Sequence, residues 1–245
     1  MPKYGMVIDL DRCYGCRACM VACKVENNTP YSHFWMYVFR LEEGEYPQTE
    51  VTFLPRPCMH CDNAPCVKVC PVGARYKEPT GIVGMDWDRC IGCRYCEVAC
   101  PYGVNYFNWK DPKKNQYLDW HDEDLIPVTG GAVPPYANPD LEGRHGEENR
   151  KIAGANHHKG VVEKCTFCVH RVEKGLQPAC VTNCPAFALH FGDLDDPDSG
   201  VSRLLAEKPS FRLEEEFNTK PRVFYVGRPH PSTEVRQIET IKARE

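Results

Sequence analysis

Residues 90–101 read CIGCRYCEVACP, and this stretch decides the fold. It places four cysteines at the spacing C-x2-C-x2-C-x3-C, followed directly by a proline. Residues 13–23 repeat the same spacing. When residues 9–23 and 86–100 are aligned without gaps, 11 of 15 positions are identical. The chain therefore contains an internal duplication.

The pattern extends outward to every cysteine of the 245-residue chain. The second and fourth groups have wider gaps, C-x2-C-x4-C-x3-C-P and C-x2-C-x11-C-x3-C-P, and they resemble each other around their last two cysteines. No cysteine is left over. In chain order the groups are Cys13, Cys16, Cys19 and Cys23; Cys58, Cys61, Cys66 and Cys70; Cys90, Cys93, Cys96 and Cys100; and Cys165, Cys168, Cys180 and Cys184.

Three cysteines within seven residues favour an iron–sulfur cubane. The C-x2-C-x2-C-x3-C-P run is the bacterial ferredoxin pattern, in which the fourth cysteine reaches the neighbouring cluster. Structural zinc is the main alternative, but zinc sites bring two distant C-x2-C pairs together. Disulfides are disfavoured because no secretory segment is recognisable. We expect Gly15 and Gly92, each in the first gap of its loop, to bring the backbone close to the cluster, where a positive φ is needed.

A two-cluster unit needs one loop of each kind, and two pairings of the groups are possible. The second and third groups are separated by only about twenty residues, the compact ferredoxin arrangement. We therefore expect them to form one unit, inserted into another that is built from the first and fourth groups. Exchanging the last cysteine within each unit predicts four ligand sets. They are Cys13, Cys16, Cys19 and Cys184; Cys165, Cys168, Cys180 and Cys23; Cys58, Cys61, Cys66 and Cys100; and Cys90, Cys93, Cys96 and Cys70.

The predicted fold is α+β, with two pseudo-symmetric ferredoxin-like modules, one inserted in the other. The outer module takes residues 1–57 and 161–228, and the inner module takes 58–104. An added hairpin is expected at 34–54, with arms at 34–41 and 49–54 around a turn at 42–45. We also expect strands at 4–10, 81–85 and 222–226, a helix at 201–208, an irregular insertion at 105–160 and a polar tail at 229–245.

Composition excludes several classes of protein. The net charge is −4 without basic blocks, so a nucleic-acid interface is not expected. No apolar stretch is long enough to span a membrane, and the first residues resemble neither a signal peptide nor a twin-arginine leader. We find no nucleotide loop or catalytic constellation, and no cysteine is spare. His145, His157 and His158 are interpreted as loop histidines, and Trp35, Trp87, Trp109 and Trp120 as packing residues. The function that these exclusions leave is electron transfer through four iron–sulfur centres.

Basic residues lie in or beside the cysteine loops. Positive charge near a cluster raises its reduction potential, so we expect a tuning role for some of them. These are Arg12, Arg17, Arg89, Arg94 and Lys164.

Three further stretches carry a family resemblance: MVIDLDRC at 6–13, PCMHCDNAPC at 57–66 and GVVEKCTFC at 160–168. They resemble the four-cluster iron–sulfur subunit of the dimethyl-sulfoxide-reductase family, of the polysulfide, thiosulfate, tetrathionate and arsenate types. Some relatives replace the second cysteine of the third group by tryptophan. Cys93 is intact here, so the resemblance implies four [4Fe–4S] clusters.

The resemblance also implies partners. These are a molybdenum or tungsten bis-pterin catalytic subunit, facing the outer module, and a separate quinone-reacting membrane subunit, near the centre of Cys90, Cys93, Cys96 and Cys70. The chain would then associate with the membrane through its partners, on the periplasmic face by co-export or on the cytoplasmic face. A freely diffusing polyferredoxin is the alternative function.

Overall fold

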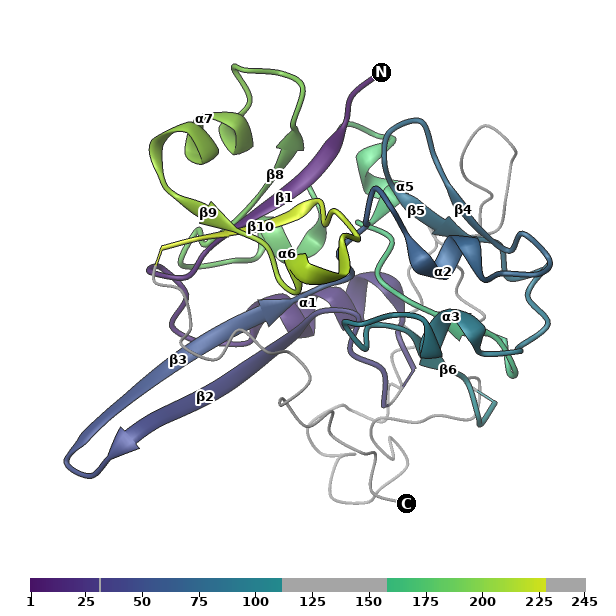
Figure 1. Ribbon diagram of the computed structural model, residues 1–245, viewed down its shortest axis with the longest axis horizontal. Coiled ribbons are helices and arrows are strands. Elements are labelled where there is room, and N and C mark those ends of the chain that lie inside the picture. The colour runs from purple at the N-terminus through teal and green to yellow at the C-terminus, as the bar shows by residue number, and fades with distance from the viewer. Residues whose placement is uncertain (31, 112–157, 228–245) are drawn as a thin grey trace, which may run out of the picture.

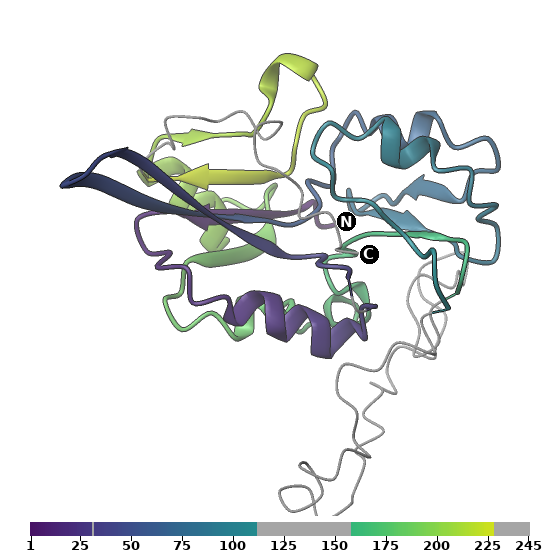
Figure 2. The same cartoon turned by 90° about the horizontal axis from the view of Figure 1, so that it is seen from below.

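The computed structural model of the protein describes residues 1–30, 32–111 and 158–227. Two bodies of secondary structure stand side by side, and a long hairpin projects from one of them (Figures 1 and 2). None of the helices in these three stretches is both long and apolar enough to cross a membrane.

The larger body is built on a four-stranded sheet of order β8-β1-β10-β9. Strand β1 (Tyr4–Asp9) lies between β8 (Leu189–Asp193), to which it is antiparallel, and β10 (Val223–Val226), to which it is parallel. Strand β9 (Ser210–Phe211) completes the edge. Because both faces of the sheet are covered by other elements, β1 carries buried apolar side chains on both faces. The expected strands at 4–10 and 222–226 are confirmed.

Helices cover both faces of this sheet. Val7 and Val226 face α7 (Gly200–Glu207), where Val201 is buried against them, so the helix expected at 201–208 is confirmed. Met6 and Ile8 point the other way into the main core, which also holds α1 (Ala18–Asn27) and α6 (Ala179–Thr182). Most cysteines belong to this main core.

The smaller body repeats part of this arrangement. Strands β4 (Arg75–Lys77) and β5 (Val83–Met85) form an antiparallel pair beside the helical turns α2 (Pro65–Lys68) and α3 (Tyr95–Val98). Strand β4 follows the second cysteine group and β5 precedes the third. In the larger body β8 follows the fourth group and β1 precedes the first, and these two strands are also antiparallel. The expected strand at 81–85 is confirmed by β5.

The hairpin is longer than expected. Strands β2 (Tyr37–Glu45) and β3 (Gln48–Arg56) pair without interruption from Tyr37↔Arg56 to Glu45↔Gln48. The predicted turn at 42–45 was wrong, because the reversal occurs at Tyr46 and Pro47. The predicted turn included Gly44, a residue type common in turns, but Gly44 lies inside β2 with a φ of 90°.

Strand β6 (Tyr106–Phe107) lies at the start of the expected insertion at 105–160, and it forms a short antiparallel ladder with β7 (Val162–Glu163), which follows the insertion. The remaining elements are α5 (Val169–Val172) and the 3-10 turn η3 (Glu215–Phe217). Residues 112–157 of the insertion lie outside the described residues, as do the tail at 229–245, Trp120, His145 and His157.

Candidate metal centres

Cysteines from distant parts of the sequence converge on shared cavities. Three cavities are each lined by four cysteines, and with the space open to solvent included they measure about 330, 320 and 310 Å³. We name the sets centre a, with Cys13, Cys16, Cys19 and Cys184; centre c, with Cys58, Cys61, Cys66 and Cys100; and centre d, with Cys70, Cys90, Cys93 and Cys96.

The other four cysteines, Cys23, Cys165, Cys168 and Cys180, are buried together and form centre b. Burial raises the pKa of Cys180 far above its usual value, and the neighbouring Cys168, Cys23 and Cys165 raise it further. The side-chain amide of Asn27 touches two of them, because its Nδ2 donates to Cys23 Sγ at 3.7 Å and to Cys168 Sγ at 3.6 Å. The structure thus brings together each of the four sets that the sequence groups as ligands.

The two duplicated loops share one backbone shape. Gly15 and Gly92 have φ values of 73° and 71°, as expected, and Arg17 and Arg94, which precede α1 and α3, both have a φ of 63°. A Cβ on Gly92 would lie 2.3 Å from the carbonyl oxygen of Gly160. Only glycine therefore fits at this point of the loop.

Short helices connect the centres in pairs. Helix α1 carries Cys19 of centre a and Cys23 of centre b, and α6 carries Cys180 of centre b just before Cys184 of centre a. Centres c and d are connected in the same way through α2 and α3.

Centres b and c meet between the two bodies. Burial raises the pKa of Cys165 in centre b, and the neighbouring Cys58 of centre c raises it further. The ring of His60, next to Cys61, stacks on Phe167 at 3.7 Å between the two cysteine groups. The order through the molecule is a, b, c, d.

Several buried thiols sit in an environment that opposes negative charge. Burial, together with neighbouring cysteines, raises the pKa of Cys19 and of Cys165 to about 12. Burial also raises the pKa of Cys66, to about 11. Thiolate ligands here need a compensating positive charge, which an iron core supplies.

No disulfide links the sixteen cysteines. Across the described ranges, no three Cys, His, Asp or Glu side chains are arranged to hold a single metal ion. The cysteines surround a space, which suits a cubane better than one zinc ion.

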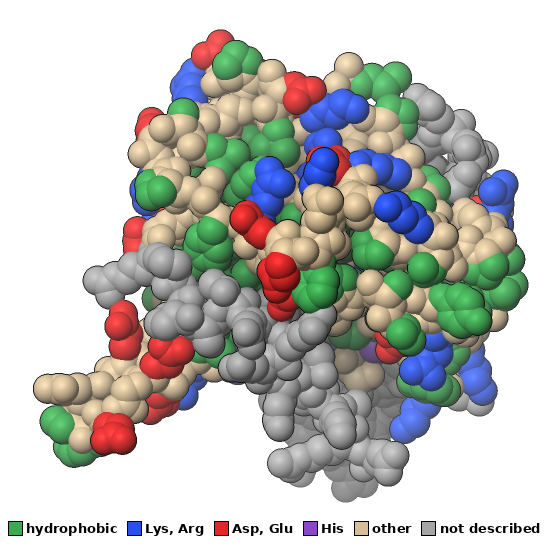
Figure 3. Space-filling view, viewed as in Figure 1, with side chains coloured by type: hydrophobic (Ala, Val, Ile, Leu, Met, Phe, Trp, Pro, Cys, Tyr) green, Lys and Arg blue, Asp and Glu red, His purple; other side chains and the backbone are tan. Residues whose placement is uncertain are grey.

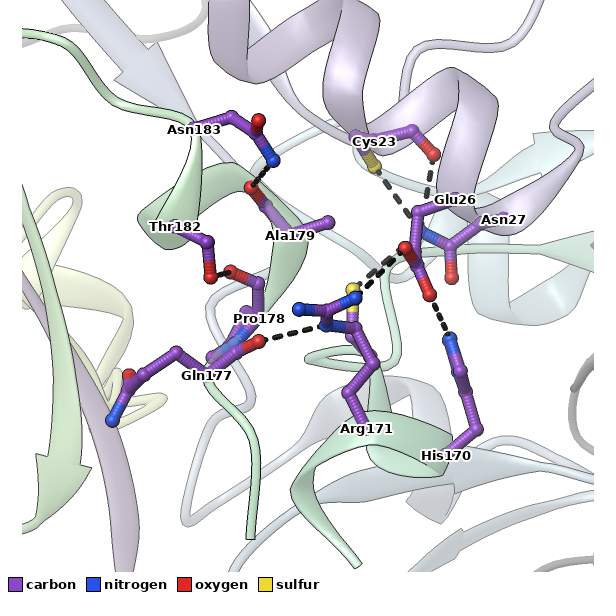
Figure 4. Close-up of polar contacts among 11 residues, drawn as sticks. Cys23, Glu26, Asn27, His170, Arg171, Gln177, Pro178, Ala179, Thr182 and Asn183 are labelled. Atoms are coloured by element: carbon purple, nitrogen blue, oxygen red, sulfur yellow. Dashed lines mark hydrogen bonds and ion pairs between the residues drawn. The ribbon is translucent and has the colours of Figure 1, made fainter. Parts of the chain in front are cut away.

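Asn27 belongs to a polar cluster that holds centre b (Figure 4). It lies on α1 next to Glu26, whose carboxylate accepts hydrogen bonds from His170 Nε2 at 2.7 Å and from Arg171 Nη1 at 3.1 Å. His170 and Arg171 come from α5, directly after Cys168. This ion cluster fixes α1 against α5, so that both elements present their cysteines to one space. Sequence reasoning missed Asn27, although its position four residues after Cys23 places it on the same helix face.

A second missed residue is Arg75 on β4, which is only 2% exposed. Its Nη2 donates to Asn105 Oδ1 at 2.8 Å and to Cys96 Sγ at 3.7 Å. Arg75 lines centre d, and its charge also lowers the pKa of Cys66 in centre c, against the larger effect of burial. No described carboxylate pairs with it. An arginine in a three-residue strand gave no pattern from which this position could be predicted.

The cations expected from the sequence occupy different environments. Lys164 is 2% exposed, lines centre c and donates from Nζ to the carbonyl oxygens of Val83 and, at 2.8 Å, of Cys165. Arg12, Arg17 and Arg89 are exposed, where solvent weakens their effect.

Arg94 is half-buried and pairs with Glu97 at 2.9 Å. Its guanidinium also lies 4.5 Å from the ring of Trp109. Trp35 and Trp87 are buried, whereas Trp109 is 63% exposed and packs at the surface against Arg94 and against the ring of Phe107 at 4.6 Å.

The two outermost centres reach the surface. Cys16 of centre a and Cys93 of centre d are the two exposed cysteines. Large apolar side chains are exposed in the same loops: Tyr14 beside centre a, and Ile91 and Tyr95 beside centre d. Phe187, which follows Cys184 of centre a, is 68% exposed. Centres b and c have no exposed cysteine.

Comparison with known proteins agrees with this geometry. The family description "4Fe-4S dicluster domain" matches twice, over residues 12–74 and over residues 49–117 with 150–194. The chain is 43% identical to the arsenate respiratory reductase iron–sulfur subunit of a Shewanella species, over 91% of this chain and 96% of that protein. It is 41% identical to a selenate reductase subunit from Mesobacillus selenatarsenatis, over 91% and 72% of the two chains. It is 39% identical to the iron–sulfur cluster-binding subunit of menaquinone reductase from Nitratidesulfovibrio vulgaris, over 92% and 89%.

Proposed function

The chain belongs to the family of four-cluster [4Fe–4S] iron–sulfur subunits of respiratory reductases of the dimethyl-sulfoxide-reductase type. We therefore propose that it transfers electrons between a molybdopterin catalytic subunit and a quinone-reacting membrane subunit. The chain is an electron-transfer subunit with four [4Fe–4S] clusters. Each cluster, when bound, takes up and releases one electron. The protein's own residues hold the four clusters in line and separate them from water.

We assign the ligands as the four cysteine sets of centres a to d. The observation that carries this assignment is the convergence of the sets of centres a, c and d around one cavity each, and the shared burial of the cysteines of centre b. In every set the last cysteine comes from the other group of its pair. Cys184 lines the same cavity as Cys13, Cys16 and Cys19, although it follows them in the sequence by at least 165 positions. The exchange of last cysteines is the arrangement that the ferredoxin motif predicts.

We further propose that the two bodies are pseudo-symmetric ferredoxin modules, the inner one inserted in the outer one. The nearly equal φ values of the duplicated loops support this. So does the antiparallel pairing of two strands in each body, β8 with β1 and β4 with β5, in which one strand follows one cysteine group and the other precedes its partner group. The inner module would take residues 58–104 and the outer one residues 1–57 and 161–228.

Partners at both ends follow from the surface positions of centres a and d. Exposed apolar side chains are typical of interaction sites, and here they occur in the loops that carry the exposed cysteines. We propose that the catalytic subunit docks at centre a, in the outer module, and that the membrane subunit docks at centre d. Membrane association would then come from the partners. A freely diffusing polyferredoxin is not favoured, because the similar proteins are named as subunits of reductases.

Native purification under anaerobic conditions tests this proposal. We expect a large subunit that contains molybdenum or tungsten to co-purify with the chain, and about sixteen irons per chain. A monomer with sixteen irons and no companion would contradict the partner assignment. A chain with far fewer irons would contradict the four centres.

A further inference from the structure

The outer half of the hairpin, residues 42–51, is a feature that electron transfer within this chain does not explain. We call it the arm. It extends well beyond both bodies in two perpendicular views (Figures 1 and 2). Its tip residue Tyr46 is 92% exposed. The arm makes no contribution to the described core, whereas the base of the hairpin is anchored by the buried Val38, Phe39 and Leu54.

An isolated two-stranded ribbon is only marginally stable in water. The arm continues the ladder past the anchored base, from Glu42↔Val51 to Glu45↔Gln48, and Val51 is 40% exposed. A two-residue turn next to the base would avoid this exposure. The length of the arm therefore favours a role in contact with another molecule.

The arm is strongly acidic. Residues 42–51 contain four glutamates, Glu42, Glu43, Glu45 and Glu50, and no Lys or Arg, so the net charge of the arm is −4. Arg40 pairs with Glu42 at 2.7 Å. Glu43 and Glu50 lie directly opposite each other in the ladder, and Glu45 lies on the same face because side chains alternate along a strand. Figure 3 shows acidic side chains along the projecting hairpin.

The base of the hairpin, from which the arm projects, lies at the rim of centre a. Val38 of β2 and Pro55 of β3 line that centre together with its cysteines. The ring of Phe53 packs against Gly15 in the cysteine loop, where a Cβ would come within 2.2 Å of it. A protein that docks over the exposed Cys16 and Tyr14 therefore lies beside the point from which the arm emerges.

We propose that the arm is a clamp, whose acidic face seats in a basic groove of the catalytic subunit and holds that subunit over centre a. This inference rests on the proposed function and deepens it. The surface that binds the arm is a protein surface rich in Lys and Arg, because an acidic ribbon is repelled by anionic lipid and by nucleic acid. A clamp set beside the exposed centre also fixes the distance over which an electron passes between the two subunits.

Two variants of the full chain test the clamp. In the first, Asn-Gly replaces residues 42–51, which closes the ladder at the Leu41↔Thr52 pair with a favoured hairpin turn. In the second, E43Q/E45Q/E50Q removes three charges without changing length. The matched control is D195N/E207Q/E216Q, which removes three charges from exposed residues outside the hairpin. Each chain is loaded with iron, and its binding to the separated large subunit is measured over a range of salt concentrations.

We expect the shortened chain to keep its iron content and cluster spectra but to bind the large subunit at least about tenfold more weakly. The glutamine variant should associate about tenfold more slowly at low salt and like the control at high salt, because steering by exposed charges is screened. Unchanged binding of both variants would overturn the clamp while leaving the proposed function intact. If the shortened chain loads less iron, the glutamine variant tests the clamp alone, and association at low salt as fast as that of the control would contradict it. Absence of any large subunit would instead contradict the proposed function itself.

Discussion

Replacing Arg75 by methionine tests how a buried charge acts on the two centres that it adjoins. Arg75 is 2% exposed and has no described carboxylate partner. A buried charge without a counter-ion is costly for a protein. Under the proposed ligand sets, the negative clusters at centres c and d supply the missing countercharge. Arg75 should therefore favour the reduced form of these clusters, which carries one more negative charge.

The magnitude follows from the contact between Arg75 Nη2 and Cys96 Sγ, which measures 3.7 Å. At an effective dielectric constant of about 20, a unit charge on that sulfur would interact with the guanidinium by about 4.5 kcal/mol. The added electron spreads over the cluster, so we take roughly half of this value, about 2 kcal/mol. For a one-electron couple that corresponds to about 90 mV.

The assay is a redox titration of the anaerobic complex, followed by electron paramagnetic resonance. We expect R75M to lower the midpoint potential of centre d by about 90 mV and that of centre c by less, and to leave centres a and b unchanged. R75K keeps the charge and should recover most of the shift. R203M is the matched control, because Arg203 is exposed and pairs with Asp198 on the surface of the larger body. An R75M potential at centre d within about 20 mV of the natural one would refute the reasoning.

Three other substitutions probe the centres. We expect C184S to damage the cluster at centre a and to spare centre b, because Cys184 lines centre a; spectra that show the opposite loss would overturn the exchange of last cysteines. N27L removes two N–H···S contacts from centre b and should lower its potential by roughly 40 mV, about 1 kcal/mol, in the same titration; a rise would contradict this. G92A forces a Cβ against a carbonyl oxygen at positive φ and should cost one cluster, or about four irons by chemical assay, whereas G200A, with open space around it, should keep all of them.

The sequence predicts the loops well because their constraints are local. A glycine with positive φ must sit in the first gap of each duplicated loop, and it does at Gly15 and Gly92. The cysteine spacing likewise limits which residues can reach one space. The turn of the hairpin was missed because two competing turn residues, Gly44 and Pro47, lie three positions apart, and local preference alone cannot choose between them.

The environment of the centres is harder to predict, because it comes from residues that meet only in the folded chain. Arg75 contacts Asn105, thirty residues later, and the carbonyl oxygen of Val162. The loop arginines were conspicuous in the sequence by their proximity to the cysteines, yet three of the four are exposed. Burial, which decides how strongly a charge acts, depends on tertiary packing.

The shared helices have a consequence for how such a chain evolves. Cys19 and Cys23 lie one turn apart on α1 and belong to two different centres, so the backbone that shapes one site also shapes the other. A change in the orientation of this helix would then disturb both centres of the pair, whereas the loss of one ligand would disturb only its own centre. Duplication of such a unit would lengthen the electron-transfer path by two clusters at a time.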